Sequence, residues 1–257
     1  VIAERFGVSL ITVRQALSHR TGLADGWFDG PTDEAGRTPF LTAILTDPDR
    51  QWEPAEVVAW TKEHLEPVAA PGKVFHYSDT NYVLLALALE AVFGRTLPEL
   101  LRTEILAPLA MEDTWFLFRE PERLPAGGAL THVYHGGTDL IPIRAMTADY
   151  GGGGLASTTH DLYRFLAGVV SGRLLQDPSS LASLWEFEPD GQGAEYGLGW
   201  SRYPDETVSL IGHGGTGGAR MFYEENFGIF VVSTVNQSGT DVELLDPVLT
   251  TVIMSLI

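Results

Sequence analysis

Tyr77, Ser78 and Asp79 bring a phenol, a hydroxyl and a carboxylate together just before an uncharged run, Tyr82–Leu89. A helix that is apolar on nearly every side belongs inside a domain, so these polar groups are expected at the mouth of a buried core helix. Burial and neighbouring groups can shift a tyrosine pKa towards a value useful in proton transfer. The residues alone also permit a plainer interpretation, in which Asp79 or Thr80 caps the helix and Tyr77 is an ordinary half-buried aromatic.

The stretch Gly212–Gly218 is the second candidate for chemistry, because it surrounds His213 with glycines. Glycines inside a strand often mark the close approach of a ligand or of another backbone. Backbone amides at such an edge can point at a developing oxyanion. The alternative is a glycine-rich bulge that carries an incidental histidine.

Two other polar stretches predict no site of their own. No lysine follows Gly151–Gly154 as a phosphate-binding loop would require, so we interpret these glycines as a tight backbone passage. His132 and His135 lie close together in sequence but lack an obvious third ligand. We therefore expect neither a metal ion nor a cofactor.

The composition narrows the chemistry further. The 257 residues include no cysteine, which excludes a cysteine nucleophile and thiolate metal sites. The formal charge of −18, from 34 acidic and 16 basic residues, repels nucleic acid and anionic membranes. Val1–Leu17 resembles the helix-turn-helix of bacterial transcription regulators, but in so acidic a chain a short capped helix, Val13–His19, is preferred. A DNA-binding regulator is kept as an alternative.

Helix signals divide most of the chain before residue 190. The predicted helices are Val13–His19, Pro54–Leu65, the core helix within His76–Gly94, a helix from the capping box Thr96–Glu99 to about Leu106, a helix capped by Thr158 with Leu162, Phe165, Leu166 and Val169 on one face, and a short helix near Ser179–Trp185. Gly94 is the expected end of the core helix. Ala110–Tyr150 lacks sustained periodicity and is predicted to form loops with short strands.

The pattern changes to that of strands after Tyr196. Strand-like runs cover Tyr196–Tyr203, Val208–Tyr223 and Phe227–Val235, with turn residues between them. Short runs joined by tight turns predict an antiparallel sheet, and an apolar helix from about Val242 is expected to cover one face of it. The fold class is therefore α+β.

Five stretches together resemble the serine β-lactamase and D-alanyl-D-alanine peptidase family, and more closely its class C and esterase-like branch. In chain order they are ITVRQALSHRTGL (Ile11–Leu23), PGKVFHYSDTNYVLLALALE (Pro71–Glu90), ILAPLAMEDTWF (Ile105–Phe116), GGLASTTHDLYRFL (Gly153–Leu166) and GHGGTGG (Gly212–Gly218). The resemblance implies an antiparallel sheet flanked by helices, with an inserted, mostly helical region. It implies one catalytic domain over residues 1–257, divided into a helical and loop region, 11–190, and a sheet with its C-terminal helix, 191–257.

Two of the three catalytic motifs of that family are found in the sequence. Tyr77–Asp79 matches Y-x-N with Asp in place of Asn, and His213–Gly215 matches the sheet motif H-x-G. The S-x-x-K nucleophile motif is absent, because no serine has a lysine three residues later. In the family this motif lies upstream of Ile11, so we expect a fragment that lacks its first strands and nucleophile helix.

The resemblance also implies roles for these residues in an acyl-enzyme mechanism. Tyr77 would move protons between the serine and the leaving group, with His213 as its electrostatic and hydrogen-bonding partner. The amide of Thr216, beside Gly214 and Gly215, would supply half of the oxyanion hole.

Two departures from the family pattern bear on the substrate. Asp79 adds a carboxylate beside Tyr77, and Gly214 lacks the hydroxyl that holds a substrate carboxylate in the peptidases and β-lactamases. Both favour a neutral ester or amide over a penicillin or a D-Ala-D-Ala peptide, although Arg220 is near enough in sequence to hold a carboxylate instead. The expected partner is thus a small ester, amide or peptide, with no nucleic acid and no membrane span.

Two properties of the chain are left open by the residues. A catalytically inactive ligand-binding module on the same fold is the second interpretation of the sequence. Since the family is mostly exported, an extracytoplasmic location is expected over a cytoplasmic one, while the sequence leaves the oligomeric state open.

Overall fold

A computed structural model describes residues 11–135, 137–175, 177–238 and 245–256. The chain forms two compact units. The first unit consists of Val1–Leu100, Phe116–Glu120 and Ile143–Gly154, and the second of Leu101–Trp115, Pro121–Pro142 and Leu155–Ile257. The expected single domain over residues 1–257 stays a prediction.

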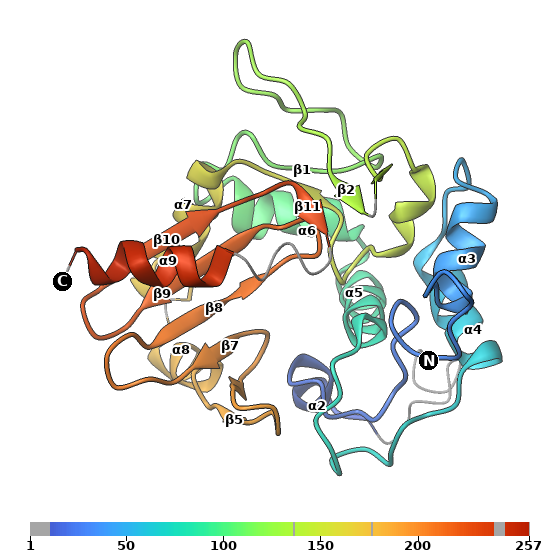
Figure 1. The fold of residues 1–257 in the computed structure, drawn as a ribbon, viewed down its shortest axis with the longest axis horizontal. Coiled ribbons are helices and arrows are strands. Elements are labelled where there is room, and N and C mark those ends of the chain that lie inside the picture. The colour runs from blue at the N-terminus through green and yellow to red at the C-terminus, as the bar shows by residue number, and fades with distance from the viewer. Residues whose placement is uncertain (1–10, 136, 176, 239–244, 257) are drawn as a thin grey trace. The chain divides into compact units, whose positions relative to one another are not determined.

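The first unit is helical. Its elements are α2 (Val13–Leu17), α3 (Pro39–Thr46), α4 (Pro54–His64), α5 (Asp79–Phe93), α6 (Leu97–Leu101) at its end and the short 3₁₀-helix η2 (Arg144–Ala148) (Figure 1). The helix α5 packs against both α2 and α4. It is therefore the centre of this unit, as its uncharged sequence predicts.

Helix α5 confirms the predicted core helix in its first half and departs from the prediction in its second. It ends at Gly94, whose φ of 65° is the left-handed conformation that favours glycine. Its early apolar residues, Val83 and Ala86 among them, are buried, but Val92 is 77% and Phe93 57% exposed. The prediction of a helix buried on nearly every side is thus wrong for the last turns of α5.

The helix α3 was missed by the sequence analysis although its signals are present. The hydroxyl of Thr38 accepts a hydrogen bond from the N–H of Leu41, and Pro39 occupies the first turn. Phe40 and Ile44, four residues apart, are fully buried. Eight residues give too short an apolar pattern to stand out, so only the packing reveals this helix.

The start of the chain bears on the helix-turn-helix alternative. Residues 1–10 of that motif lie outside the described residues. The expected capped helix at Val13 is confirmed as α2, where Thr12 and Gln15 form a reciprocal capping box. Because α2 packs against α5, its role in the described structure is to support the core helix.

The second unit is built on a six-stranded antiparallel sheet with the order β10-β9-β8-β7-β6-β5. The strands are β5 (Glu188–Pro189), β6 (Glu195–Tyr196), β7 (Ser201–Tyr203), β8 (Leu210–Gly214), β9 (Arg220–Glu224) and β10 (Ile229–Ser233). The expected run Val208–Tyr223 is two strands, because the turn that follows Gly214 reverses the chain and pairs His213 with Met221. The predicted antiparallel sheet is confirmed.

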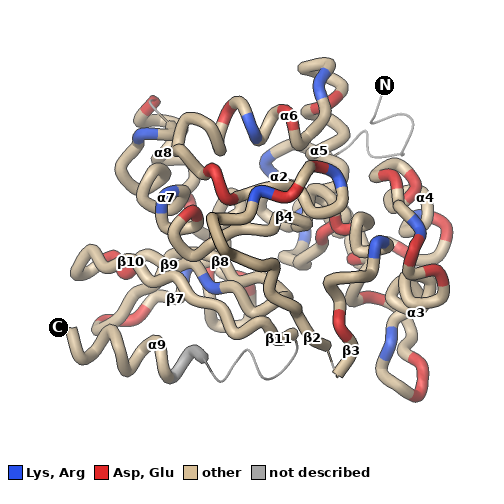
Figure 2. The backbone as a smooth tube through the Cα atoms, turned by 90° about the horizontal axis from the view of Figure 1, so that it is seen from above, with Lys and Arg blue, Asp and Glu red and all other residues tan. Residues whose placement is uncertain are grey.

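Helices cover both faces of this sheet. They are α7 (Thr159–Val170) and α8 (Pro178–Leu184) on one face and α9 (Leu245–Met254) on the other (Figures 1 and 2). The side chain of Thr158 caps α7 through the N–H of Asp161, as predicted. Leu166 and Val169 of α7 pack with Trp200 and Ile211 of the sheet side in one buried cluster. The expected final helix is confirmed, although Val242 itself lies outside the described residues.

The stretch Ala110–Tyr150 consists of loops with short strands, as predicted. The remaining elements are the π-helix η1 (Arg102–Leu106), β1 (Trp115–Phe116), β2 (Tyr134–His135), β3 (Thr138–Asp139), β4 (Leu155–Ala156) and β11 (Gln237–Ser238). Strand β2 lies between β3 and β11 in a small sheet of the second unit. Within the described ranges, no helix has the length and apolar character needed to cross a membrane.

Candidate active site

The helix α5 begins at Asp79, so the predicted cap by Asp79 or Thr80 is wrong. Ser78 occupies the N-cap position but makes no side-chain hydrogen bond to the helix. The N–H of Asp79 donates instead to Oδ2 of Asp25 at 3.0 Å. A carboxylate at this end also interacts favourably with the helix dipole. Asp25, from a remote loop, therefore caps the helix that carries the candidate site.

Ser78 is fully buried and fixes the backbone beside the candidate tyrosine. Its hydroxyl donates to the carbonyl of Ala24 at 3.0 Å, and its N–H donates to Nδ1 of His19 at 3.0 Å. The hydroxyl of Thr80 donates to the same carbonyl of Ala24 at 3.0 Å. These hydrogen bonds make Ser78 a structural residue, since an attacking serine needs an accessible oxygen.

Tyr77 lies at the rim of this cluster, with 36% of the residue exposed. Its ring lies 4.1 Å from that of His19, at an angle of 31°. Its hydroxyl is hydrogen-bonded to the carboxyl group of Asp79. Burial raises the pKa of Tyr77, and the charges of Asp79 and Asp149 raise it further. The phenol is therefore held in its protonated form, as a hydrogen-bond donor that is a weaker acid than a free tyrosine, and the shift runs away from the value expected to be useful in proton transfer.

Three aspartates gather next to Tyr77: Asp25, Asp79 and Asp149. Burial raises the pKa of Asp25, although N–H groups that donate to its carboxylate oppose this effect. Burial, followed by the charges of Asp149 and Asp25, raises the pKa of Asp79 well above its usual range. Burial and the charge of Asp25 raise the pKa of Asp149 to about 7. The carboxylate expected beside Tyr77 is thus held by its surroundings towards the neutral, protonated form.

The glycines Gly151–Gly154 make the tight backbone passage that the sequence predicts. A Cβ on Gly151 would lie 2.2 Å from the carbonyl oxygen of Tyr82, and one on Gly153 2.2 Å from Oδ2 of Asp149. Real side chains do not tolerate such distances. The passage therefore lets the chain cross α5 and lets Asp149 fold back towards Asp79.

The second predicted group lies on the hairpin of β8 and β9 in the second unit. Nδ1 of His213 lies 2.7 Å from the carbonyl oxygen of Gly214, which can only accept, so Nδ1 carries the proton. Nε2 is then free of a proton and accepts from the hydroxyl of Tyr196 at 3.1 Å. Burial lowers the pKa of His213, and Arg220 lowers it to a smaller extent. His213 is therefore a neutral hydrogen-bonding residue rather than a cation.

The turn after His213 uses some of its amides and leaves others at the surface. The N–H of Gly215 donates to the carbonyl of Ala219 at 2.8 Å, and that of Gly218 donates to Gly215 at 2.9 Å. The amide of Gly215 is thus engaged within the hairpin. Thr216, at the tip of the turn, is exposed.

Arg220 occupies the space that Gly214 leaves open. A Cβ on Gly214 would lie 2.6 Å from Nη1 of Arg220, which also donates to the carbonyl of Ala219 at 3.1 Å. The missing hydroxyl at residue 214 is thus accompanied by a guanidinium group at the same place. This geometry gives a physical basis to the alternative that Arg220 holds a substrate carboxylate.

The structure places the predicted residues in two groups. Tyr77 and Asp79 come together in the first unit, and His213 with the turn to Thr216 forms a group in the second. The sequence analysis missed Asp25, Asp149 and Tyr196. The glycines Gly151–Gly154, close after Asp149, are a sequence signal that could have indicated it. Asp25 and Tyr196 act through contacts with distant residues, which no local sequence pattern predicts.

The histidines considered as metal ligands have other partners. Nδ1 of His132 lies 2.5 Å from Oδ2 of Asp139, and Nδ1 of His135 lies 3.1 Å from the hydroxyl of Ser238. Among the residues with described positions, no three histidines or carboxylates are arranged to hold a metal ion.

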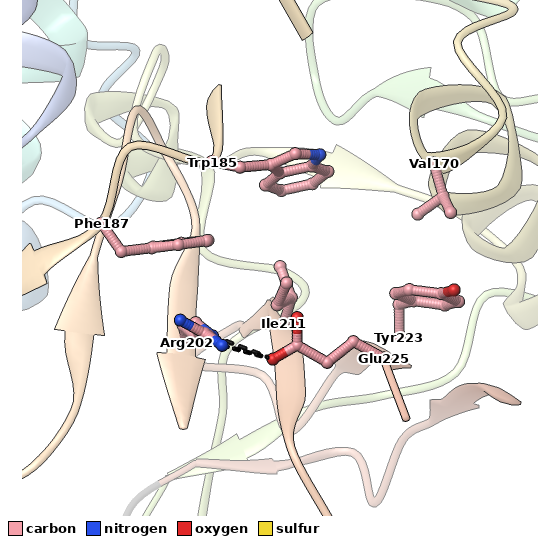
Figure 3. Close-up of a pocket in the computed structure, with 7 residues that line it drawn as sticks. All are labelled: Val170, Trp185, Phe187, Arg202, Ile211, Tyr223 and Glu225. Carbon is pink, nitrogen blue, oxygen red and sulfur yellow. Dashed lines mark hydrogen bonds and ion pairs between the residues drawn. The ribbon is translucent and has the colours of Figure 1, made fainter. Parts of the chain in front are cut away.

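A cavity of about 240 Å³ lies in the second unit (Figure 3). Its lining residues are Val170, Trp185, Phe187, Arg202, Ile211, Tyr223 and Glu225. Arg202 donates through Nε to Glu225 at 2.9 Å and through Nη1 to Glu195 at 3.3 Å. The lining thus combines aromatic walls with an ion pair, and it contains none of the predicted site residues.

A family model described as Beta-lactamase matches residues 6–250. The chain belongs to the beta-lactamase family. This confirms the family resemblance drawn from the sequence, and the match includes both candidate groups. It also accounts for most of the residues of the helix-turn-helix alternative.

Three comparisons illustrate the relationship. Over 224 residues, which make up 80% of this chain and 46% of the relative, the chain is 28% identical to penicillin-binding protein 4* of Bacillus subtilis (strain 168). It is 24% identical over 214 residues to a D-aminopeptidase of Cereibacter sphaeroides (strain KD131 / KCTC 12085), 82% of this chain and 39% of the relative. The crystal structure of D-amino acid amidase from Ochrobactrum anthropi SV3 matches with a TM-score of 0.76 and 25% identity, over 95% of this chain and 72% of that one. The chain therefore spans less than half the length of these two curated relatives, and its α+β fold is that of the family.

Proposed function

We propose that this chain is part of a serine hydrolase that cleaves amide or ester bonds through an acyl-enzyme. The observation that carries the proposal is the position of the Tyr77 phenol, which lies at the rim of a buried cluster and is hydrogen-bonded to Asp79. Although burial and the nearby carboxylates weaken it as an acid, the phenol can give its proton to the strongly basic nitrogen of an amide leaving group and recover one from the nucleophile that attacks next. The names of the relatives, a D-aminopeptidase and a D-amino acid amidase among them, support this class of reaction.

His213 and Thr216 have supporting roles in this proposal. A neutral His213, with its proton on Nδ1 and its Nε2 bound to Tyr196, orients hydrogen bonds without adding a charge. The amide of the exposed Thr216 is our candidate for one donor of an oxyanion hole. A preformed donor of this kind typically contributes ~10²–10³ in rate.

We find no candidate for the nucleophilic serine among the 257 residues. No serine in the 257 residues has a lysine three positions later, and Ser78 is buried and hydrogen-bonded. The proposal therefore places the reacting serine outside these residues, in a longer protein. An extracytoplasmic location of that protein stays a prediction from the family resemblance.

The sequence favours a neutral substrate on two grounds, the charge of Asp79 and the missing hydroxyl at Gly214, and the geometry weakens both. The raised pKa of Asp79 reduces the repulsion of an anion, and Arg220 beside Gly214 supplies a cation where the hydroxyl is missing. We therefore propose short amides and peptides derived from amino acids ahead of simple esters. The amidase and aminopeptidase relatives are consistent with this order.

Kinetics on the longer protein that contains this chain test the proposal. Tyr77→Phe should lower kcat/KM for a D-amino acid amide by ~10²–10⁴, as expected for a lost proton donor. Tyr203→Phe, in a tyrosine that is 48% exposed on β7, is the matched control and should retain full activity. A fluorophosphonate probe should label the longer protein on a serine outside residues 1–257.

Two outcomes would contradict the proposal. Labelling of a serine within residues 1–257 would show that the nucleophile is misplaced. A longer protein that binds substrate but forms no acyl-enzyme, and that lacks an S-x-x-K motif upstream of these residues, would instead establish the ligand-binding module.

A further inference from the structure

The side chains of Asp79 and Asp149 both border the space over Gly152. A Cβ on Gly152 would lie 2.8 Å from Oδ1 of Asp149 and 3.0 Å from Cγ of Asp79, so both groups border the same small space. Because Gly152 has no side chain, residue 152 places no atom of its own in that space. Two ionised carboxylates cannot share so small a buried space without a large repulsion.

Hydrogen bonds distinguish these two groups from Asp25. Asp25 accepts from the N–H of Asp79 at 3.0 Å and from the N–H of Trp27 at 2.7 Å, which supports its ionised form. Oδ1 of Asp149 is buried and has no hydrogen-bond partner among the residues that the structure describes. A buried carboxylate oxygen without a donor is costly, and a proton shared with a neighbouring carboxyl group removes that cost.

The other titratable groups around the pair do not supply the missing positive charge. From the loop that faces α5, His19 accepts at Nδ1 from the N–H of Ser78. Asp29 accepts from the N–H of Asp25 at 2.7 Å and is paired with Nε2 of His76 at 2.7 Å. Two phenols complete the surroundings, those of Tyr77, which is hydrogen-bonded to Asp79, and of Tyr82, which donates to the carbonyl of Leu17 at 2.8 Å.

We infer that Asp79 and Asp149 hold one proton between them, and that Asp149 is a positioning residue that keeps Asp79 an O–H donor next to Tyr77. This inference rests on the proposed function in that it takes the Tyr77 rim as the reaction site. In the free site the O–H of Asp79 donates to Asp149; when an amide or peptide substrate binds, the same O–H can turn to its carbonyl oxygen, as the amide of an asparagine would donate. Asp149 does not touch the substrate in this scheme and acts only through Asp79.

The direction of the pKa shifts agrees with this arrangement. The pKa of Asp149 is raised to about 7 by burial and by Asp25, and that of Asp79 is raised well above its usual range by burial and by Asp149. The shared proton, which is the last one on the pair, is therefore lost near or above neutral pH. Above that point Asp79 becomes a carboxylate and ceases to donate.

The pH dependence of kcat/KM in the longer protein is the first test. For an amide substrate, activity should fall as the pair loses its last proton. Asp149→Asn should move that fall to lower pH by about one pH unit, because Asp79 loses the neighbouring charge that raises its pKa. Asp79→Asn should remove the fall, since the amide is a donor at every pH. Asp49→Asn, at an exposed aspartate of the same unit, is the matched control and should leave the profile unchanged.

A carboxyl titration followed by ¹³C NMR of the same protein, labelled at aspartate side chains, separates this inference from the proposed function. One carboxyl group of the pair should stay protonated at pH 6 and titrate at lower pH in Asp149→Asn. If both Asp79 and Asp149 are ionised at pH 6, the inference is wrong whatever the activity. If the shared proton is found in a protein that never forms an acyl-enzyme, the pair is as inferred and the proposed function is wrong.

Discussion

The aspartate pair should make the stability of the fold fall as the pH rises from about 4 to about 7. Burial and Asp25 raise the pKa of Asp149 from 3.8 to about 7, so the folded chain binds this proton more tightly than the unfolded chain. The resulting stabilisation is complete below the unfolded pKa and is lost as the pH rises to about 7. At ~1.4 kcal/mol for each pH unit between the two values, it amounts to at most ~4 kcal/mol. Since Asp79 and Asp149 titrate together, we expect ~2–4 kcal/mol for the pair.

The substitution Asp149→Asn isolates this effect. The variant lacks one of the two titrating carboxyl groups, and the pKa of Asp79 moves down, so its free energy of unfolding should fall less between pH 5 and pH 8 than that of the unchanged chain. His213, whose lowered pKa makes the fold more stable as the pH rises towards 6.5, contributes equally to both proteins and cancels in the comparison. At pH 8 the variant should therefore be the more stable of the two.

Urea unfolding at pH 5, 6, 7 and 8 measures the difference, with Asp49→Asn as the control for the loss of an exposed carboxylate. The control should keep the pH dependence of the unchanged chain. If Asp149→Asn keeps it as well, Asp149 is ionised throughout this range. The reasoning from its buried, unpartnered oxygen would then be refuted.

Three further predictions concern the hairpin of the second unit. Glu224→Ala should lower the free energy of unfolding by ~3–5 kcal/mol, because the fully buried carboxylate accepts three backbone N–H groups; a loss under ~1 kcal/mol in urea unfolding would contradict this. Tyr196→Phe should raise the pKa of His213, since Nε2 loses the donor that favours the neutral ring; an unchanged NMR titration of His213 would show that the hydrogen bond has no such effect. Arg220→Gln and Gly214→Thr should both lower kcat/KM selectively for substrates with a carboxylate, by about one to two decades, because the first removes the cation and the second displaces it; equal losses on neutral amides would remove Arg220 from substrate recognition.

Local signals predicted most of the fold. Thr158 and Asp161 mark the start of α7, and Gly94 marks the end of α5, because caps depend on residues three or four positions apart. The helix α3 carries the same kind of signal at Thr38 but was missed, since eight residues show too little periodicity. The exposed last turns of α5 could not be predicted at all, because exposure depends on what the rest of the chain places beside them.

The candidate site was predictable only where its parts are contiguous. Tyr77 and Asp79 are two residues apart, and His213 is embedded in its glycines, so patterns reveal both groups. Asp25 is 54 residues before the amide that it caps, and Tyr196 is 17 residues before His213. Such partners are selected by the packing of separate segments, which no local pattern records.

Remote partners decide the chemistry of Asp79 and Gly214. Taken alone, Asp79 is a negative charge that repels an anionic substrate, and Gly214 is a missing hydroxyl. Burial and the charge of Asp149 oppose the first conclusion, because together they raise the pKa of Asp79 and favour its neutral form. Arg220 reverses the second, because its guanidinium lies where a side chain on Gly214 would begin. Asp79 and Gly214, taken alone, each disfavour an anionic substrate. With Asp79 neutral and Arg220 present, both positions are compatible with an anionic substrate. The substrate preference of this site therefore has to be measured at a pH where the aspartate pair is protonated, in a protein that retains Arg220.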